Sequence, residues 1–154
     1  AILEEYRKPV ILHDDLLGEL VYNRQIKTFE GSILWQDEKI YITLDVDKDN
    51  KGGITKGKKA LKAMISNQSK WGEDLPYFAA KSLIKCAREW DESDARESEI
   101  SEEDFAKRIR ISSIWMTSGG SFSVYFDDDD IFFGHTIRVS GSLKKGLVSA
   151  NIEG

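Results

Sequence analysis

The chain has 154 residues, a length typical of a single domain. Hydrophobic residues make up 40% of it and charged residues 32%, a balance that fits neither a disordered chain nor a membrane protein. The formal net charge of −5 disfavours binding to nucleic acid, and the single cysteine, Cys86, excludes an intramolecular disulfide.

Alternating apolar and polar residues dominate the first third of the chain. They predict one strand around Leu20 and Tyr22, which Leu16 extends, a second over residues 29–35 and a third over residues 40–46. The connections between these strands are short and polar, which favours antiparallel pairing. We therefore expect a β-meander at this end of the chain.

Helical spacing of apolar residues replaces the alternation in the middle of the chain. It predicts one helix over residues 58–68 and a second that ends near Trp90. Asp74 is the expected N-cap of the second helix, with Pro76 in its first turn, where a missing N–H is no loss. Residues 101–104 resemble a capping box and predict a short third helix.

Strand patterns return in the last third. They predict a hairpin of residues 111–116 and 122–126, followed by strands over residues 131–139 and 147–152. The order of strands, helices and strands predicts an α+β fold, with antiparallel β-meanders at both ends and two or three central helices packed on one side. We expect one domain over residues 1–154.

Charge is distributed in blocks. Residues 48–70 contain seven lysines and one acid, whereas residues 89–104 contain nine acids and one base, and residues 127–130 are four aspartates. Such blocks are typical of solvated faces, and they also steer charged partners. If the partner is basic, the expected docking residues are Glu89, Asp91, Glu92, Asp94, Asp128 and Asp129.

Two stretches come close to ligand-binding motifs. Residues 52–59 nearly match the phosphate loop G-x-x-x-x-G-K-[ST], but Lys59 replaces the hydroxyl that binds magnesium. Asp45, Asp47 and Asp49 are spaced as in a calcium loop, yet either frame places lysine at a ligand position. We therefore expect no metal, no cofactor and no binding of ATP or GTP at residues 52–59.

The two histidines are the remaining candidates for chemistry. His135 lies among apolar neighbours, which favours a hydrogen-bonded structural role over a general base. His13 precedes Asp14 in an expected loop, where the pair could form a base with an orienting acid. No motif places a serine or cysteine nucleophile beside either histidine, and Cys86 falls on an apolar helix stripe, so we predict no catalytic residue.

The C-terminal part resembles a bacterial family known as domain of unknown function 2262. The resemblance is carried by the stretch Ile131-Phe132-Phe133-Gly134-His135-Thr136-Ile137-Arg138-Val139, by Gly141 and Gly146, and by the ending Ala150-Asn151-Ile152-Glu153-Gly154. Leu17-Gly18, Phe29-Glu30-Gly31 and residues 79–90 are also similar, so the resemblance covers most of residues 16–154. The family has no established activity, and its members look like single-domain proteins of bacterial conflict systems.

The resemblance and the acidic blocks together imply a function. We expect a non-enzymatic protein-binding domain, an immunity protein that neutralises a cognate bacterial toxin, with a basic toxin domain as partner and neither nucleic acid nor membrane bound. The alternative is a small-ligand binder or a hydrolase-like enzyme that uses His135. The first residues show no signal-peptide pattern, so we expect a cytoplasmic location.

Overall fold

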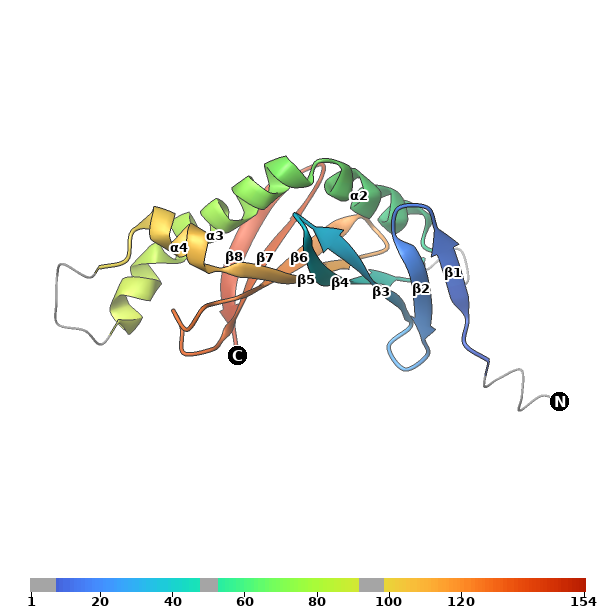
Figure 1. Cartoon of the computed structure of the whole chain (residues 1–154), viewed down its shortest axis with the longest axis horizontal. Helices are drawn as coiled ribbons and strands as arrows, with labels where there is room; N and C mark the ends of the chain where they lie inside the picture. Colours follow the sequence, from blue (N-terminus) through green and yellow to red (C-terminus); the bar gives the residue numbers. More distant parts are fainter. Residues whose placement is uncertain (1–7, 48–52, 92–98) are drawn as a thin grey trace.

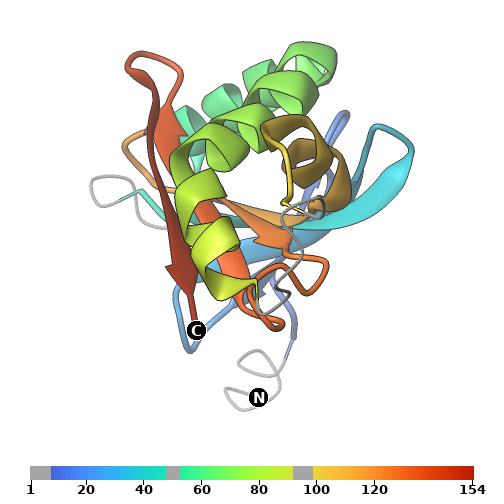
Figure 2. The ribbon, with the colours of Figure 1, turned by 90° about the vertical axis from the view of Figure 1, so that its left-hand side faces the viewer.

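One curved sheet carries the helices on a single face (Figures 1 and 2). The computed structural model describes residues 8–47, 53–91 and 99–154. The strands are β1 (Ile11–Asp14), β2 (Gly18–Asn23), β3 (Thr28–Trp35), β4 (Glu38–Asp45), β5 (Arg110–Met116), β6 (Ser121–Asp127), β7 (Thr136–Ser142) and β8 (Gly146–Glu153). The helices are α2 (Thr55–Ser66), α3 (Gln68–Trp90) and α4 (Glu102–Arg108).

The strands lie in the sheet in chain order, from β1 at one edge to β8 at the other. Neighbours pair antiparallel within β1–β4 and within β5–β8, so both predicted meanders are confirmed. The two meanders join through one parallel pair, β4 with β5, in which Tyr41 lies opposite Ser113. Parallel neighbours need a long crossover, and the three helices supply it.

The core fills the space between the helices and the sheet. Alternate residues of β4, Ile40, Ile42 and Leu44, are buried, as the period of two predicts. Small side chains on the buried face of α3 allow this helix to lie close to the sheet. Its buried residues are Leu75, Ala79, Ala80, Leu83, Ile84 and Ala87.

Several predicted boundaries are wrong. Residues 11–14 form β1, whereas we expected His13 and Asp14 in a loop, and Leu16 lies in the turn after it. The helix α2 begins at Thr55, and α3 begins at Gln68, so Asp74 and Pro76 lie inside α3. Pro76 cannot donate to the carbonyl of the preceding turn, but burial of the helix face outweighs that loss.

The short helix α4 follows its capping signal. The side-chain oxygen of Ser101 accepts a hydrogen bond from the backbone N–H of Asp104 at 3.1 Å. Three acids occupy the first turn and two bases the last, which complements the helix dipole. None of the helices in the described ranges is both long enough and apolar enough to cross a membrane.

Candidate functional site

The structure brings the two acidic segments together at one end of the molecule. Arg108 of α4 donates from Nε to the Asp129 carboxylate at 2.8 Å and from Nη2 to the Asp129 carbonyl at 2.7 Å. Trp90, the last residue of α3, packs edge-on against Phe132 of the β6–β7 turn. We call this region the acidic end. Its exposed carboxylates belong to Glu89, Asp91, Glu99, Glu102, Glu103, Asp104, Asp127, Asp129 and Asp130.

Not all of the predicted docking residues are available at the acidic end. Glu89, Asp91 and Asp129 are exposed there. Glu92 and Asp94 lie outside the residues that the structure describes. Asp128 is only 2% exposed, so the expectation that it is a solvated docking charge is wrong.

Asp128 is buried because it holds the β6–β7 turn together. One carboxylate oxygen accepts from the backbone N–H groups of Phe132 at 2.8 Å and Gly134 at 3.0 Å. The other accepts from the backbone N–H of Asp130 at 3.1 Å. Turn amides that find no backbone partner need another acceptor, and a carboxylate can serve several of them.

The same turn overturns the strand predicted over residues 131–139. Asp129, Asp130 and Phe133 have φ of 49°, 60° and 58°, a left-handed conformation that extended strands do not contain. The strand β7 therefore begins only at Thr136. The conformation also turns Phe133 outward, where it is 60% exposed and stacks on Trp90 with ring centroids 5.5 Å apart.

His135 is half-buried behind this aromatic pair. Its Nδ1 is hydrogen-bonded to the backbone oxygen of Phe132, and its ring meets Trp90 edge-on with centroids 5.4 Å apart. Gly154 lies so close that a Cβ at that position would touch the imidazole ring. These contacts fit the structural role that the sequence favoured.

His13 and Asp14 do not form a base with an orienting acid. The His13 side chain is 71% exposed and faces Glu19 at 3.9 Å. Asp14 accepts from the backbone N–H groups of Leu16 and Leu17 and from Lys62 of α2. Burial opposes ionisation of Asp14, but these hydrogen bonds outweigh it and lower its pKa from 3.8 to about 2.

The aspartates of the calcium-like stretch have structural partners. Asp45 accepts from the indole N–H of Trp115 at 2.8 Å, and Asp47 accepts from the backbone N–H of Thr55 at 3.0 Å. Asp49 lies outside the described residues, as does Gly52 of the near phosphate loop, whereas residues 55–59 of that stretch form the start of α2. In the described parts of the chain, no group of three or more His, Cys, Asp or Glu side chains is placed to hold a metal ion.

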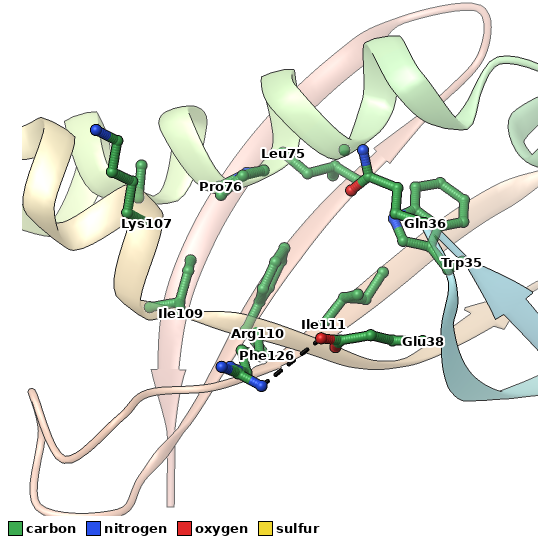
Figure 3. A pocket seen from close by; sticks show the side chains of 12 residues that line it. Trp35, Gln36, Glu38, Leu75, Pro76, Lys107, Ile109, Arg110, Ile111 and Phe126 are labelled. Atoms are coloured by element: carbon green, nitrogen blue, oxygen red, sulfur yellow. Dashed lines mark ion pairs between the residues drawn. The ribbon is translucent and has the colours of Figure 1, made fainter.

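A cavity of about 300 Å³ opens between the β3–β4 turn, α3 and α4 (Figure 3). Trp35, Leu75 and Phe126 line its apolar part, and Glu38 and Arg110 form an ion pair of 3.6 Å beside it. Gln36 and Lys107 also line the cavity, and Lys107 pairs with Glu103 at 2.9 Å, so both cations of the lining are paired with carboxylates.

A larger groove of about 700 Å³ lies at the ends of the strands opposite the β6–β7 turn. We call it the lysine groove. The helix α2 lines it with Lys56 and Lys59, and the β7–β8 turn lines it with Lys144 and Lys145. We did not predict it from the sequence, because more than eighty residues separate the two pairs; the lysine block at 48–70 was the only signal.

Comparisons with known proteins identify the family of the chain. No curated protein and no solved structure matches the chain. A family model for uncharacterized proteins conserved in bacteria matches residues 14–152, nearly the whole chain. The predicted resemblance is therefore confirmed, and the chain belongs to the DUF2262 family.

Proposed function

We propose that this protein is a binding protein whose acidic end docks on a basic protein, as an immunity protein that neutralises a bacterial toxin would. The observation that carries the proposal is the meeting of two distant acidic segments around Phe133, an exposed ring that stacks on the half-buried Trp90. Neither segment alone would form such a surface.

The arrangement has the anatomy of a protein interface. Binding energy concentrates in a few aromatic anchors, while a charged rim contributes specificity and association rate. Phe133 supplies an exposed ring, and stacking on Trp90 limits the side-chain freedom that docking would otherwise cost. The left-handed backbone at Phe133 presents that ring to solvent despite its conformational cost.

The carboxylates around the pair suit a basic partner. Glu89, Asp91 and Glu102 are exposed at the junction of α3 and α4. Long-range attraction between such charges and a basic surface speeds the encounter before contacts form. A toxin that acts on nucleic acid would carry the basic surface that this end requires.

The first experiment is to identify the partner. Tagged full-length protein is used to capture proteins from native lysate, and mass spectrometry identifies what is bound. We expect a basic bacterial protein, encoded beside this chain in the genome. Capture of a partner with an acidic surface instead would contradict docking through the acidic end.

The second experiment measures association rates with that partner by surface plasmon resonance over a salt series. We expect Glu89→Lys with Asp91→Lys to slow association, and the difference to shrink as salt shortens the Debye length below about 8 Å. Phe133→Ala is expected to speed dissociation, because it removes an anchor rather than a steering charge.

A matched control separates local charge from net charge. Glu73→Lys with Asp74→Lys makes the same change in net charge on α3, roughly 24 Å along the helix axis from Glu89. We expect this control to associate nearly as fast as the natural protein. If both double variants slow association equally, or if the association rate does not depend on salt, the interface lies elsewhere. The lysine stretch 48–70 is then the next candidate.

A further inference from the structure

We propose that the lysine groove binds a nucleoside phosphate without magnesium. This inference is independent of the docking proposal, because the groove lies at the strand ends opposite the acidic end. The turns β5–β6 and β7–β8 border the groove, whereas the β6–β7 turn, with its aspartates, lies at the other ends of the same antiparallel strands. Figure 1 shows α2 beside the tip of the β7–β8 hairpin.

The first argument is uncompensated positive charge. Lys56 and Lys59 of α2, with Lys144 and Lys145 of the β7–β8 turn, form no ion pair within the described parts of the chain. By contrast, Lys62 on another face of α2 pairs with acids of the β1–β2 turn. Four unpaired lysines around one groove, in a chain of net charge −5, create a local positive potential that attracts anions.

The second argument is that the polar lining consists of donors. No lining residue carries a carboxylate, all of them lying within the described ranges. Ser123 accepts a hydrogen bond from Arg138, and Ser142 accepts one from the backbone N–H of Lys145. Each hydroxyl therefore keeps its own hydrogen to donate, and phosphate oxygens only accept.

The third argument is the apolar surface between the lysines. Ala60 and Ala63 contribute small side chains on the α2 side, whereas Phe122, which is 2% exposed, keeps its ring in the core beneath the groove. Val148, which is 61% exposed, completes this surface. Small-molecule sites typically measure about 300–1,000 Å³ and are mostly apolar with a few polar groups, a description that this groove meets.

A groove of about 700 Å³ has room for a ring system as well as for phosphates. A flat base can lie on the exposed apolar surface with its phosphates toward the lysines. Gly120, at φ 89°, places the β5–β6 turn against α2, where a Cβ would stand 3.8 Å from the Lys56 side chain and 3.9 Å from Ala60.

The absence of a carboxylate from the lining decides the role of magnesium. A phosphate loop shares its nucleotide with magnesium held by a hydroxyl and an acid, but here ammonium groups alone would meet the phosphate charge. Magnesium bound to the free nucleotide then competes with the lysines and weakens binding. Lys56 and Lys59 belong to residues 52–59, so this proposal departs from the expectation that this stretch binds no ATP or GTP; the lysines would act as side-chain cations without magnesium rather than as part of a phosphate loop.

The test is a calorimetric titration of the full chain with ATP, in EDTA and then with excess magnesium. We expect saturable one-to-one binding in EDTA that weakens with magnesium and with salt. Lys56→Gln with Lys59→Gln, and separately Lys144→Gln with Lys145→Gln, should each weaken binding about tenfold or more, because each double removes two charged donors. The second double lies in an exposed turn, so it tests the groove even if the first impairs folding.

The control double is Lys81→Gln with Lys85→Gln, which removes the same charge from exposed positions of α3. We expect it to bind ATP as the natural protein does. Three results would overturn the proposal: equal loss in the control, equal binding of inorganic phosphate, or tighter binding of dodecyl phosphate than of ATP. Acidic-end variants should keep ATP binding, so a failure here is distinguishable from a failure of the docking proposal.

Discussion

At the scale of single residues, three buried or half-buried polar groups hold turns in place. Asp128 accepts from three backbone amides, His135 is hydrogen-bonded to the carbonyl of Phe132, and Asp14 joins the β1–β2 turn to α2. Each replaces a hydrogen bond that the local backbone cannot make for itself. Loss of such a group leaves its partners buried and unsatisfied, which costs more than the bond contributes.

Asp128→Ala is expected to lower the free energy of unfolding by about 2–3 kcal/mol, because it leaves turn amides without acceptors. Urea unfolding measures this. Asp130→Asn is the control: the residue is exposed, and asparagine tolerates its positive φ, so we expect a change within about 0.5 kcal/mol. Similar stability of the two variants would contradict the structural role of Asp128.

His135→Ala is expected to cost about 1–3 kcal/mol of stability, since it removes a hydrogen bond and an aromatic contact. Partner binding by the folded fraction should survive. His13→Ala, at an exposed position, should leave the melting temperature unchanged. If His135→Ala melts as the natural protein does but loses binding or activity, a functional histidine, including the enzyme alternative, becomes the better interpretation.

Asp14 makes stability depend on pH in a defined direction. Its folded pKa of about 2 lies below the ordinary 3.8, so the ionised form favours the folded state. This contribution, about 1–3 kcal/mol, is present above pH 4 and is lost as the pH falls toward 2. Asp14→Asn should therefore be less stable at pH 7 and approach the natural protein near pH 2. If the difference in unfolding free energy between Asp14→Asn and the natural protein does not change with pH, the stabilising role of the ionised Asp14 is contradicted.

At the scale of elements, helix boundaries depend on more than their local signals. The helix α4 begins directly after its capping residue, Ser101, whose side chain accepts from the backbone N–H of Asp104 in the first turn. The helix α3 begins six residues before its predicted N-cap, since Gln68 accepts from the backbone of Gln36 in the β3–β4 turn. A tertiary contact thus moves one boundary and leaves the other in place.

Ser101→Ala is expected to destabilise the protein by about 1 kcal/mol, the usual cost of losing an N-cap. Ser82→Ala is the matched control, because Ser82 is exposed in the middle of α3, where alanine is the better helix former. Thermal melts of both variants measure the contribution of the Ser101 cap to stability. Equal melting temperatures would mean that the cap contributes nothing.

At the scale of the whole molecule, opposite charges gather at opposite ends of the strands. The acidic end and the lysine groove each combine residues from distant parts of the chain. Under our two proposals each end has its own class of partner, a basic protein for one and an organic anion for the other. Asp45 and Asp47, the described aspartates of the calcium-like stretch, accept hydrogen bonds from Trp115 and Thr55.

We expect the melting temperature to be the same with and without EDTA. The aspartates of the calcium-like stretch that the structure describes are engaged in hydrogen bonds, and one cysteine with two histidines cannot build a usual zinc site. A fall of several degrees in EDTA would show a structural metal and contradict the prediction.

The sequence by itself determined the class of most elements and most of their order. A period of two marked β4, and Ser101 with Asp104 marked α4, because these signals act between residues close in the chain. Only the tertiary structure decided which distant segments meet. The parallel pairing of β4 with β5, the burial of Asp128 and the lysine groove depend on packing across dozens of residues, and no local pattern encodes such packing.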